Sequence, residues 1–456
     1  MFSKLSFIFL CAFAVIGAQQ LLSLEKAISL AVEKNEKSLL ASEGIEIAKG
    51  HKREQLGKMF PSISLTGGWT KINDDLEIDL NGIRDAMIYL HSAPPNGVGT
   101  LPAAVLEQRL PSFSKKVQND NFWNAAVQAQ WAIFTGGRLW SQYKAASGEE
   151  TVAEAKRNAV VGGLAKETAL RYFSLMLVEA NKKVQEENLA SINTHFENAK
   201  KLQDAGQIAN TERLRAEVAL AEAQMNLQDA KRNAEIARLA LANSINADTN
   251  FTIIAEWKKI EPPSLATIAG AALEGNPNLK QIASEESRAK NGVSAASGEW
   301  FPAVALFGMK ELYTRDLTVL QPDWAFGVKA EWNLFSRTTT LGKRSAAKAQ
   351  VRALNYMGEA AARDIKLGVE KYLREWSAAN EKLETLEKTE NLARTAFNAQ
   401  ELAFSAGMAT GLDVIDARFA LSRVQLAKMA TYFETYKAFA ELQDLCGNAE
   451  EIGRNW

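Results

Sequence analysis

Cysteine and histidine are scarce in this sequence, and their scarcity excludes several kinds of site. The chain has 2 cysteines and 3 histidines among 456 residues. The histidines are His51, His91 and His195, and none has a second ligand at metal-binding spacing. No phosphate-binding loop and no nucleophile motif occurs. We therefore expect a protein that is not an enzyme and that holds no cofactor and no metal.

An excess of either charge is also missing. The 53 basic side chains are balanced by 54 acidic ones. A surface that binds nucleic acid needs a clustered basic excess, so we expect no nucleic-acid partner.

Long apolar runs are missing after the first 18 residues. Met1–Ala18 has the layout of a secretory leader, with Lys4, an apolar stretch and small residues at the end. That stretch is too short to span a bilayer as a helix. Lipidation of Cys11 is not expected, because Leu10 stands where a small residue is needed. Since no apolar run of about 20 residues follows, any membrane insertion of the mature chain must use strands.

Proline is absent from two long parts of the chain. None of the 10 prolines falls between Phe122 and Glu261 or after Pro322. A proline inside a helix costs about 3 kcal/mol, so its absence favours long helices in both parts. Apolar residues there recur at alternating spacings of three and four, which is typical of a coiled-coil seam.

The chain contains two copies of one plan. The segments Phe196–Met225 and Phe397–Leu426 each indicate a helix, a turn at an Ala-Gly pair and a second helix. Pro262-Pro263 separates the copies. We therefore predict a leader over residues 1–18, a first repeat over 19–261 and a second repeat over 262–456.

Each copy is predicted to hold two strands and a long helical hairpin. Alternating apolar and polar residues indicate strands at about 61–72, 122–135, 302–314 and 323–335. The hairpins are expected over 139–246 and 339–445, and a short helix over 22–34 opens the first copy. Residues 73–120 contain several prolines and glycines and are predicted to form a loop, with a short helix near 83–90. Whether this loop covers the mouth of a pore is left open.

The lengths of the predicted helices indicate how they pack. A helix over 139–202 would be roughly 95 Å long, whereas its returning partner over 210–246 would reach only about 55 Å. A helix over 37–59 adds about 35 Å, which makes up the difference. We therefore expect two shorter helices stacked end to end along each long helix, and residues 279–300 play the same part in the second copy.

The four predicted strands have a length that crosses a bilayer. Four strands cannot close a barrel, and open strand edges are not tolerated in lipid. The barrel must therefore be shared between subunits. Three copies would supply 12 strands, and two copies would supply 8. Tryptophans near the strand ends suit the two membrane interfaces: Trp69, Trp123, Trp131, Trp324 and Trp332. The alternative is a soluble β-sandwich with one wet face.

Several short motifs recur in a fixed order along this plan. They are Phe60-Pro61, Phe301-Pro302, Phe134-Thr135-Gly136-Gly137, Ala406-Gly407 and Leu412–Asp416. The ordered set resembles the TolC-like outer-membrane efflux protein family over nearly the whole mature chain. The resemblance implies a mainly α fold, with long α-helical hairpins in a trimeric tunnel and four strands per chain in a shared 12-stranded β-barrel. It also implies a homotrimer in outer-membrane lipid that works with a periplasmic adaptor protein and an inner-membrane transporter.

The implied function is that of a passive exit channel of a tripartite efflux pump or a type I secretion system. The sequence does not indicate the cargo, which in such channels is a drug, a metal ion or a protein. The alternative is a periplasmic coiled-coil scaffold or adaptor without a pore. Strands of membrane length with aromatic ends argue against it, since an adaptor would need none.

Two carboxylates form the sharpest candidate site. Asp413 and Asp416 lie three residues apart, so they share a helix face just after the second turn. In a trimer they would form two rings of three carboxylates, and the resemblance assigns aspartates at these positions to the periplasmic constriction. The alternative for Asp413 is a capping box with Thr410. The family's pattern has arginine where Ala409 stands and tyrosine where Phe404 stands, so the latch that those side chains form is not expected here.

The two turns are the expected contacts for the adaptor, because small residues let another helical hairpin approach closely. They comprise Ala205, Gly206, Gln207 and Ile208 in the first copy, and Ala406, Gly407, Met408, Ala409 and Thr410 in the second. The alternative is that these turns only end the hairpins.

On the polar faces of the strands, the candidates for the barrel lumen are Gln128, Gln130, Lys329 and Glu331.

Overall fold

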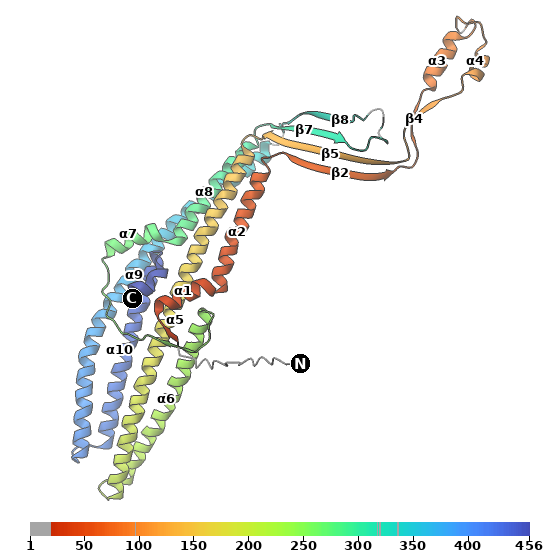
Figure 1. The fold of residues 1–456 in the computed structure, drawn as a ribbon. Coiled ribbons are helices and arrows are strands. Elements are labelled where there is room, and N and C mark those ends of the chain that lie inside the picture. The colour runs from red at the N-terminus through yellow and green to blue at the C-terminus, as the bar shows by residue number, and fades with distance from the viewer. Residues whose placement is uncertain (1–19, 96, 317, 319–320, 335–336) are drawn as a thin grey trace, which may run out of the picture. The chain divides into compact units, whose positions relative to one another are not determined.

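The computed structural model describes residues 20–95, 97–316, 318, 321–334 and 337–456. The expected leader, residues 1–18, lies outside that part. The chain divides into two compact units, one holding residues up to 49, 148–287 and 352–456, the other holding 50–147 and 288–351. Each unit draws on both halves of the sequence. The long helices α5 (Arg138–Asp204) and α9 (Arg337–Ser405) each have residues in both units (Figure 1).

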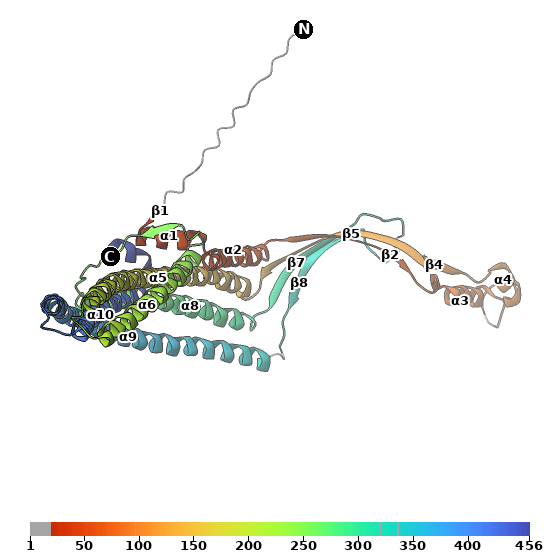
Figure 2. The same cartoon turned by 90° about the horizontal axis from the view of Figure 1, so that it is seen from below.

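The first unit is built on two antiparallel helical hairpins. Helix α6 (Asn210–Ser244) returns along α5, and α10 (Gly411–Leu445) returns along α9 (Figures 1 and 2). The buried seam of α6 consists mostly of alanine at spacings of three, four and seven: Ala216, Ala219, Ala223, Leu227, Ala230, Ala234 and Leu241. Small side chains on this seam allow close helix packing, as expected for a coiled-coil contact.

The main core of the first unit lies where the hairpins meet the short helices α1 (Leu24–Lys34) and α7 (Leu265–Gly275). Two short strands, β1 (Gln20–Leu22) and β6 (Phe251–Ile253), pair in parallel beside it. The buried hydroxyl of Tyr172 joins them. Its oxygen lies 3.0 Å from the carbonyl oxygen of Leu22, the last residue of β1, and 2.9 Å from that of Ile254, just after β6. Its single proton is available to either carbonyl, and its oxygen accepts from the backbone N–H of Ile254. The helix expected from residue 22 therefore begins two residues later, after a strand that the sequence did not predict.

The second unit contains a four-stranded antiparallel sheet in the order β2-β5-β7-β8 within the described residues. Its strands are β2 (Ser62–Lys71), β5 (Asn121–Phe134), β7 (Ala303–Glu311) and β8 (Trp324–Glu331). The first two lie where the sequence predicts them. The last two are shorter than predicted. Beyond Glu311 the ladder becomes irregular, since the N–H groups of Leu312 and Tyr313 both point to the carbonyl of Ala125.

The stretch between β2 and β5 is more ordered than the predicted loop. It forms a pair of antiparallel strands, β3 (Leu76–Asp79) and β4 (Ser114–Gln118), that carry α3 (Asn81–His91) and α4 (Ala103–Arg109). Helix α3 contains the short helix expected near residue 83. The other elements were missed because each is short and lies between prolines and glycines, which dominate the local pattern.

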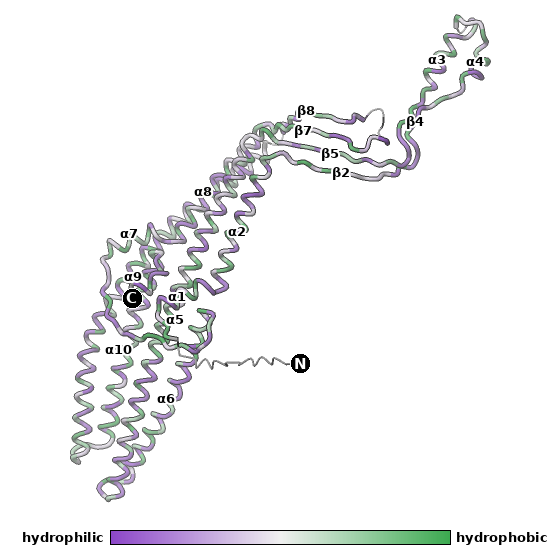
Figure 3. Tube along the Cα trace, in the orientation of Figure 1, coloured by the Kyte–Doolittle hydropathy of each residue, from purple (hydrophilic) through white to green (hydrophobic). Residues whose placement is uncertain are grey.

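Hydrophobic and hydrophilic residues interleave along the long helices instead of forming continuous apolar blocks (Figure 3). Among the residues that the structure describes, none of the helices is both long and apolar enough to cross a membrane.

Candidate functional site

The two hairpin turns have the same backbone geometry. Gly206 and Gly407 adopt φ angles of 71° and 73°, in the left-handed region that glycine enters without strain. In each turn the glycine N–H bonds a carbonyl three residues back, and the next N–H bonds a carbonyl five residues back. This pattern ends both helices sharply and satisfies their last carbonyls. Both turns are exposed, and Met408 is 79% exposed at the tip of the second.

Helix α10 starts with the capping box that was the alternative role for Asp413. One carboxylate oxygen of Asp413 accepts from the backbone N–H of Thr410 at 2.8 Å and from its hydroxyl at 2.7 Å. The backbone N–H of Asp413 in turn donates to the Thr410 hydroxyl at 3.3 Å. These bonds from the Thr410 side chain and backbone hold the pKa of Asp413 below its ordinary value. Asp413 and Asp416 are both exposed, so the capping role leaves their charge facing solvent.

At the matching start of α6 in the first copy, an acidic side chain is paired with a basic one. Glu212 accepts from Arg215 at 2.8 Å across one helical turn. The second hairpin therefore carries uncompensated negative charge at its helix start, and the first does not.

The side chain of His195 on α5 lies where the two hairpins meet. It is 5% exposed, and its ring is 4.7 Å from the ring of Phe404 on α9. A Cβ added at Gly411 on α10 would lie 3.0 Å from His195 Nε2 and 3.4 Å from Glu212 Oε2, so both polar atoms converge on this glycine. Burial lowers the pKa of His195, while the nearby Glu212 carboxylate opposes that shift. The ring of Phe404 thus packs on a buried imidazole.

A second buried contact joins the hairpins further along α10. Arg418 on α10 is 5% exposed, and its Nε donates to Asn188 Oδ1 on α5 at 3.3 Å. Ser422 donates to the same oxygen at 3.4 Å. The guanidinium also lies over the ring of Phe397 on α9, 5.5 Å from its centre. Three helices are therefore held by a buried arginine whose direct partners are uncharged.

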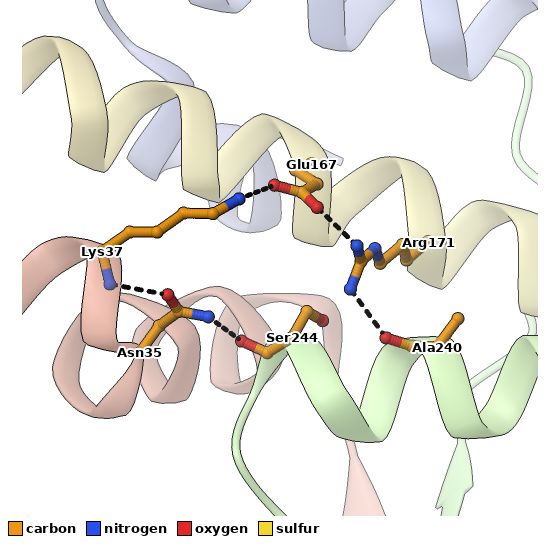
Figure 4. Close-up of polar contacts among 6 residues, drawn as sticks. All are labelled: Asn35, Lys37, Glu167, Arg171, Ala240 and Ser244. Atoms are coloured by element: carbon orange, nitrogen blue, oxygen red, sulfur yellow. Dashed lines mark hydrogen bonds and ion pairs between the residues drawn. The ribbon is translucent and has the colours of Figure 1, made fainter.

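The joint between α1 and α2 (Glu36–Gly57) is made by Asn35, which is 9% exposed (Figure 4). Its side-chain oxygen accepts from the backbone N–H of Lys37 at 3.0 Å and so caps α2. Its amide nitrogen donates to the carbonyl of Ser244 at 3.2 Å, at the last residue of α6. Helix α2 therefore starts where α6 ends, as the expected end-to-end stacking requires.

Charged side chains brace this joint against α5 (Figure 4). Lys37 Nζ lies 3.0 Å from Glu167 Oε2. The other carboxylate oxygen of Glu167 accepts from Arg171 at 2.5 Å, and Arg171 also donates to the carbonyl of Ala240 at 2.9 Å. These contacts link α2, α5 and α6.

The second copy repeats the joint with Asn276, which is 3% exposed. Its amide nitrogen donates to the carbonyl of Leu445 at 3.0 Å, at the last residue of α10. Its oxygen accepts from the N–H groups of Asn278 and Leu279 at 3.0 and 3.2 Å and caps α8 (Pro277–Gly298). The internal duplication therefore extends to a specific hydrogen-bonding device.

The four candidates for the barrel lumen lie on one face of the sheet. The register aligns Gln130 with Phe307 and Phe307 with Gly327, and alternate residues of a strand share a face. Gln128 on β5 and Lys329 and Glu331 on β8 therefore share the face of Gln130. Lys329 and Glu331 form an exposed ion pair at 3.4 Å.

The opposite face of the sheet is apolar and exposed. Across the strands the register runs from Ile63 through Ala129 and Gly308 to Phe326. Ile63 is 76% exposed and Phe326 is 79% exposed. Proteins in water rarely expose a continuous apolar face of this kind, so it indicates a surface that contacts a membrane or another protein.

A family model described as outer membrane efflux protein matches residues 100–247 and 268–448. The chain belongs to this family. The match covers both helical hairpins and the strands β5, β7 and β8. A search of curated proteins gives no significant match.

Solved channels share the fold of this outer membrane efflux protein at low sequence identity. The VceC outer membrane protein of Vibrio cholerae is 16% identical, with a TM-score of 0.73 over 93% of this chain and 96% of that one. The CmeC outer membrane channel of Campylobacter jejuni is 15% identical, with a TM-score of 0.75 over 95% and 89%. The MtrE outer membrane channel of Neisseria gonorrhoeae, in its open state, is 18% identical, with a TM-score of 0.69 over 94% and 89%.

Sequence reasoning missed the buried contacts that join the hairpins of this outer membrane efflux protein. His195 and Arg418 are polar residues inside otherwise ordinary helical seams, so no local signal distinguishes them from exposed residues. The joints carried a usable signal, since Asn35 and Asn276 occupy matching positions in the two copies. A helix break that recurs as asparagine in both copies indicates capping, although it does not reveal the partner carbonyl.

Proposed function

We propose that three copies of this chain join edge to edge, with β8 of one copy beside β2 of the next, and close a 12-stranded barrel in the outer membrane. One observation carries this proposal: in the described sheet β2 and β8 are edge strands, and one face is apolar and exposed. An open edge in lipid leaves backbone N–H and C=O groups without partners. Three chains in a ring remove every edge and turn the polar face toward a lumen.

The helical hairpins of the three copies would form a tunnel. Exposed apolar side chains support lateral packing between copies, because isolated helices would leave them in water. On α6 and α9 they include Val218, Ile236, Leu392 and Leu402, which are 60%, 64%, 71% and 72% exposed. The tunnel would act as a passive exit duct that needs no catalytic residue.

Asp413 and Asp416 would line the constriction of this tunnel as two rings of carboxylates. Both are exposed at the start of α10, and the corresponding start of α6 is neutralised by its own arginine. Rings of negative charge attract cations and repel anions. The exposed turns at Gly206 and Gly407 would be the contacts for a periplasmic adaptor, which links the duct to an inner-membrane transporter.

The test is single-channel conductance of purified protein in a planar bilayer. The variant Asp413→Asn/Asp416→Asn removes the charges, while asparagine at 413 keeps an oxygen that can cap Thr410. Asp204→Asn, at the end of α5, is the matched control, because it removes an exposed carboxylate from the other hairpin. We expect the double variant to lose cation selectivity and block by multivalent cations, and the control to keep both.

The outcomes separate the parts of the proposal. Trimeric protein that forms a pore with unchanged selectivity in the double variant would place the constriction elsewhere. Trimeric protein that forms no pore would refute the duct.

A further inference from the structure

The insert between β2 and β5, described over residues 76–95 and 97–118, is a folded element with one side that contacts no other described part of the chain. Helix α3 packs its inner side on α4 and the following loop. Ile88 is 4% exposed, Arg84 donates to the carbonyl of Leu110 at 2.8 Å, and Asn81 accepts from the N–H of Phe113 at 3.0 Å. These contacts define the orientation of the helix within the insert.

The other side of α3 carries an apolar stripe. Ile83, Met87 and Leu90 follow one another at spacings of four and three, so they share one helix face. They are 58%, 53% and 60% exposed. Arg84 and Ile88, four residues apart, lie on the packed side. An amphipathic helix normally buries its apolar stripe, and here the chain itself leaves the stripe uncovered.

The base of the insert is held firmly on the sheet. The ladder of β2 and β5 continues into it, because the N–H of Ile72 donates to the carbonyl of Asp120 at 2.7 Å. Lys71 and Asp120 form an ion pair at 2.5 Å, and Gln118 donates to the carbonyl of Asp316 at 3.1 Å. Figures 1 and 2 show α3 and α4 beyond the ends of β2 and β5. The insert therefore occupies the same place relative to β2 in every copy.

Its neighbour is then another copy of the same chain. β2 is an edge strand that the proposed barrel pairs with β8 of the next copy, so each insert arises beside an intersubunit seam. A stripe of three side chains is too small to hold free proteins together. Inside a preformed trimer the effective concentration of one stripe near another is in the millimolar range, so a weak contact suffices.

We propose that the α3 helices of the three copies pack on one another through Ile83, Met87 and Leu90 and form an apolar cap at the outer mouth of the pore. This inference rests on the proposed trimeric channel. It assigns α3 a contact between subunits, formed at the end of the strands away from α2 and α5.

Disulfide cross-linking tests the contact directly, because the described chain offers no accessible thiol. Its one cysteine, Cys446, is 6% exposed. Met87→Cys places a thiol on the stripe, and Asp85→Cys places one on the same helix off the stripe, at a residue whose side chain is 67% exposed. Oxygen with copper phenanthroline oxidises two thiols to one disulfide. We expect Met87→Cys trimers to give covalent dimers, with at most two of the three chains linked, and Asp85→Cys trimers to give at least tenfold less.

Conductance supplies the second measurement. The variant Ile83→Ser/Met87→Ser/Leu90→Ser keeps the packed side of α3 and removes the apolar stripe. We expect it to remain trimeric and to show an at least twofold higher open fraction than wild type. Equal open fractions would refute the cap.

The outcomes distinguish this inference from the proposed function. Trimeric, conducting Met87→Cys protein without covalent dimers would overturn the α3 contact and leave the duct intact. If a bimane label on the thiol of the Met87→Cys variant instead reported a lipid environment in vesicles of phospholipid and lipopolysaccharide, the stripe would face the membrane, and the inference would be wrong. Protein that is not trimeric would refute the proposed function itself.

Discussion

The joint at Asn35 is expected to stabilise the first turn of α2 by about 2.5 kcal/mol, and replacing this residue tests that estimate. Asn35 makes two bonds of different kinds, one that caps α2 and one that satisfies the carbonyl of Ser244. Loss of a helix cap costs about 1 kcal/mol. Leaving a buried carbonyl without its donor costs about 1.5 kcal/mol. Asn35→Ala should lose both contributions, whereas Asn35→Ser keeps a capping oxygen and should lose only the second.

Hydrogen exchange measured by mass spectrometry reports the opening of this joint. If opening is fast, the exchange rate of the first turn of α2 scales with the equilibrium for local opening. At about 0.59 kcal/mol for RT, we expect about 12-fold faster exchange for Asn35→Ser and about 70-fold for Asn35→Ala. The matching joint at Asn276 is the internal control, because its own bonds are untouched.

The reciprocal variant completes the test. Asn276→Ala should accelerate exchange at the start of α8 and leave the start of α2 unchanged. Equal acceleration at both joints in either variant would show a global loss of stability, and less than threefold acceleration at the mutated joint would refute the capping argument.

Two further predictions concern other buried contacts. Burial holds the pKa of His195 in the folded protein below its ordinary value. The unfolded chain therefore binds the proton more readily than the folded one. The contribution of neutral His195 to the free energy of unfolding is complete above about pH 6.5 and is lost as the pH drops below that value. After correction for the intrinsic pH dependence of amide exchange, the opening equilibrium near the end of α5 should rise between about pH 7.5 and roughly pH 5 in wild type. The same quantity should change less in His195→Phe, and identical corrected pH profiles would contradict this. Gly275→Ala would place a Cβ 2.0 Å from the carbonyl oxygen of Cys446 and should destabilise the protein by about 1–3 kcal/mol in chemical unfolding. Gly270→Ala, on the same helix with no atom within 4 Å of the added Cβ, should stabilise it by roughly 0.5–1 kcal/mol, and equal effects of both changes would refute the clash.

The sequence predicted the hairpins closely because their signals are long and repeated. The prolines stop before α5 and α6 and again before α9 and α10, and seams at spacings of three and four continue for many turns. The Ala-Gly pairs mark both turns, because only glycine enters the left-handed conformation there without strain. Periodicity over such lengths averages out local exceptions.

Short elements were predicted poorly for the opposite reason. The strand β1 has three residues, and its pairing with β6 joins segments more than 200 positions apart. Nothing local in either segment indicates the other. In the insert only the helix near residue 83 was predicted, and it is present as α3. The elements β3, α4 and β4 were missed, because they are too short to outweigh the surrounding prolines and glycines.

The capping role of Asp413 shows what a motif alone can establish. Thr410 and Asp413 have the spacing of a capping box, and the structure forms it. The proposed role in a constriction depends on where three copies place this carboxylate, which no spacing within one chain defines.

By itself the sequence determined the long helical hairpins of this protein and the strands β2 and β5, because periodicity and proline exclusion are properties of neighbouring residues. Tertiary structure alone decided which distant groups meet. It placed the amide of Asn35 on the last carbonyl of α6, the imidazole of His195 against Phe404, and the apolar stripe of α3 on an uncovered side. Such contacts depend on packing between segments far apart in the chain, and that packing is not encoded in any single stretch.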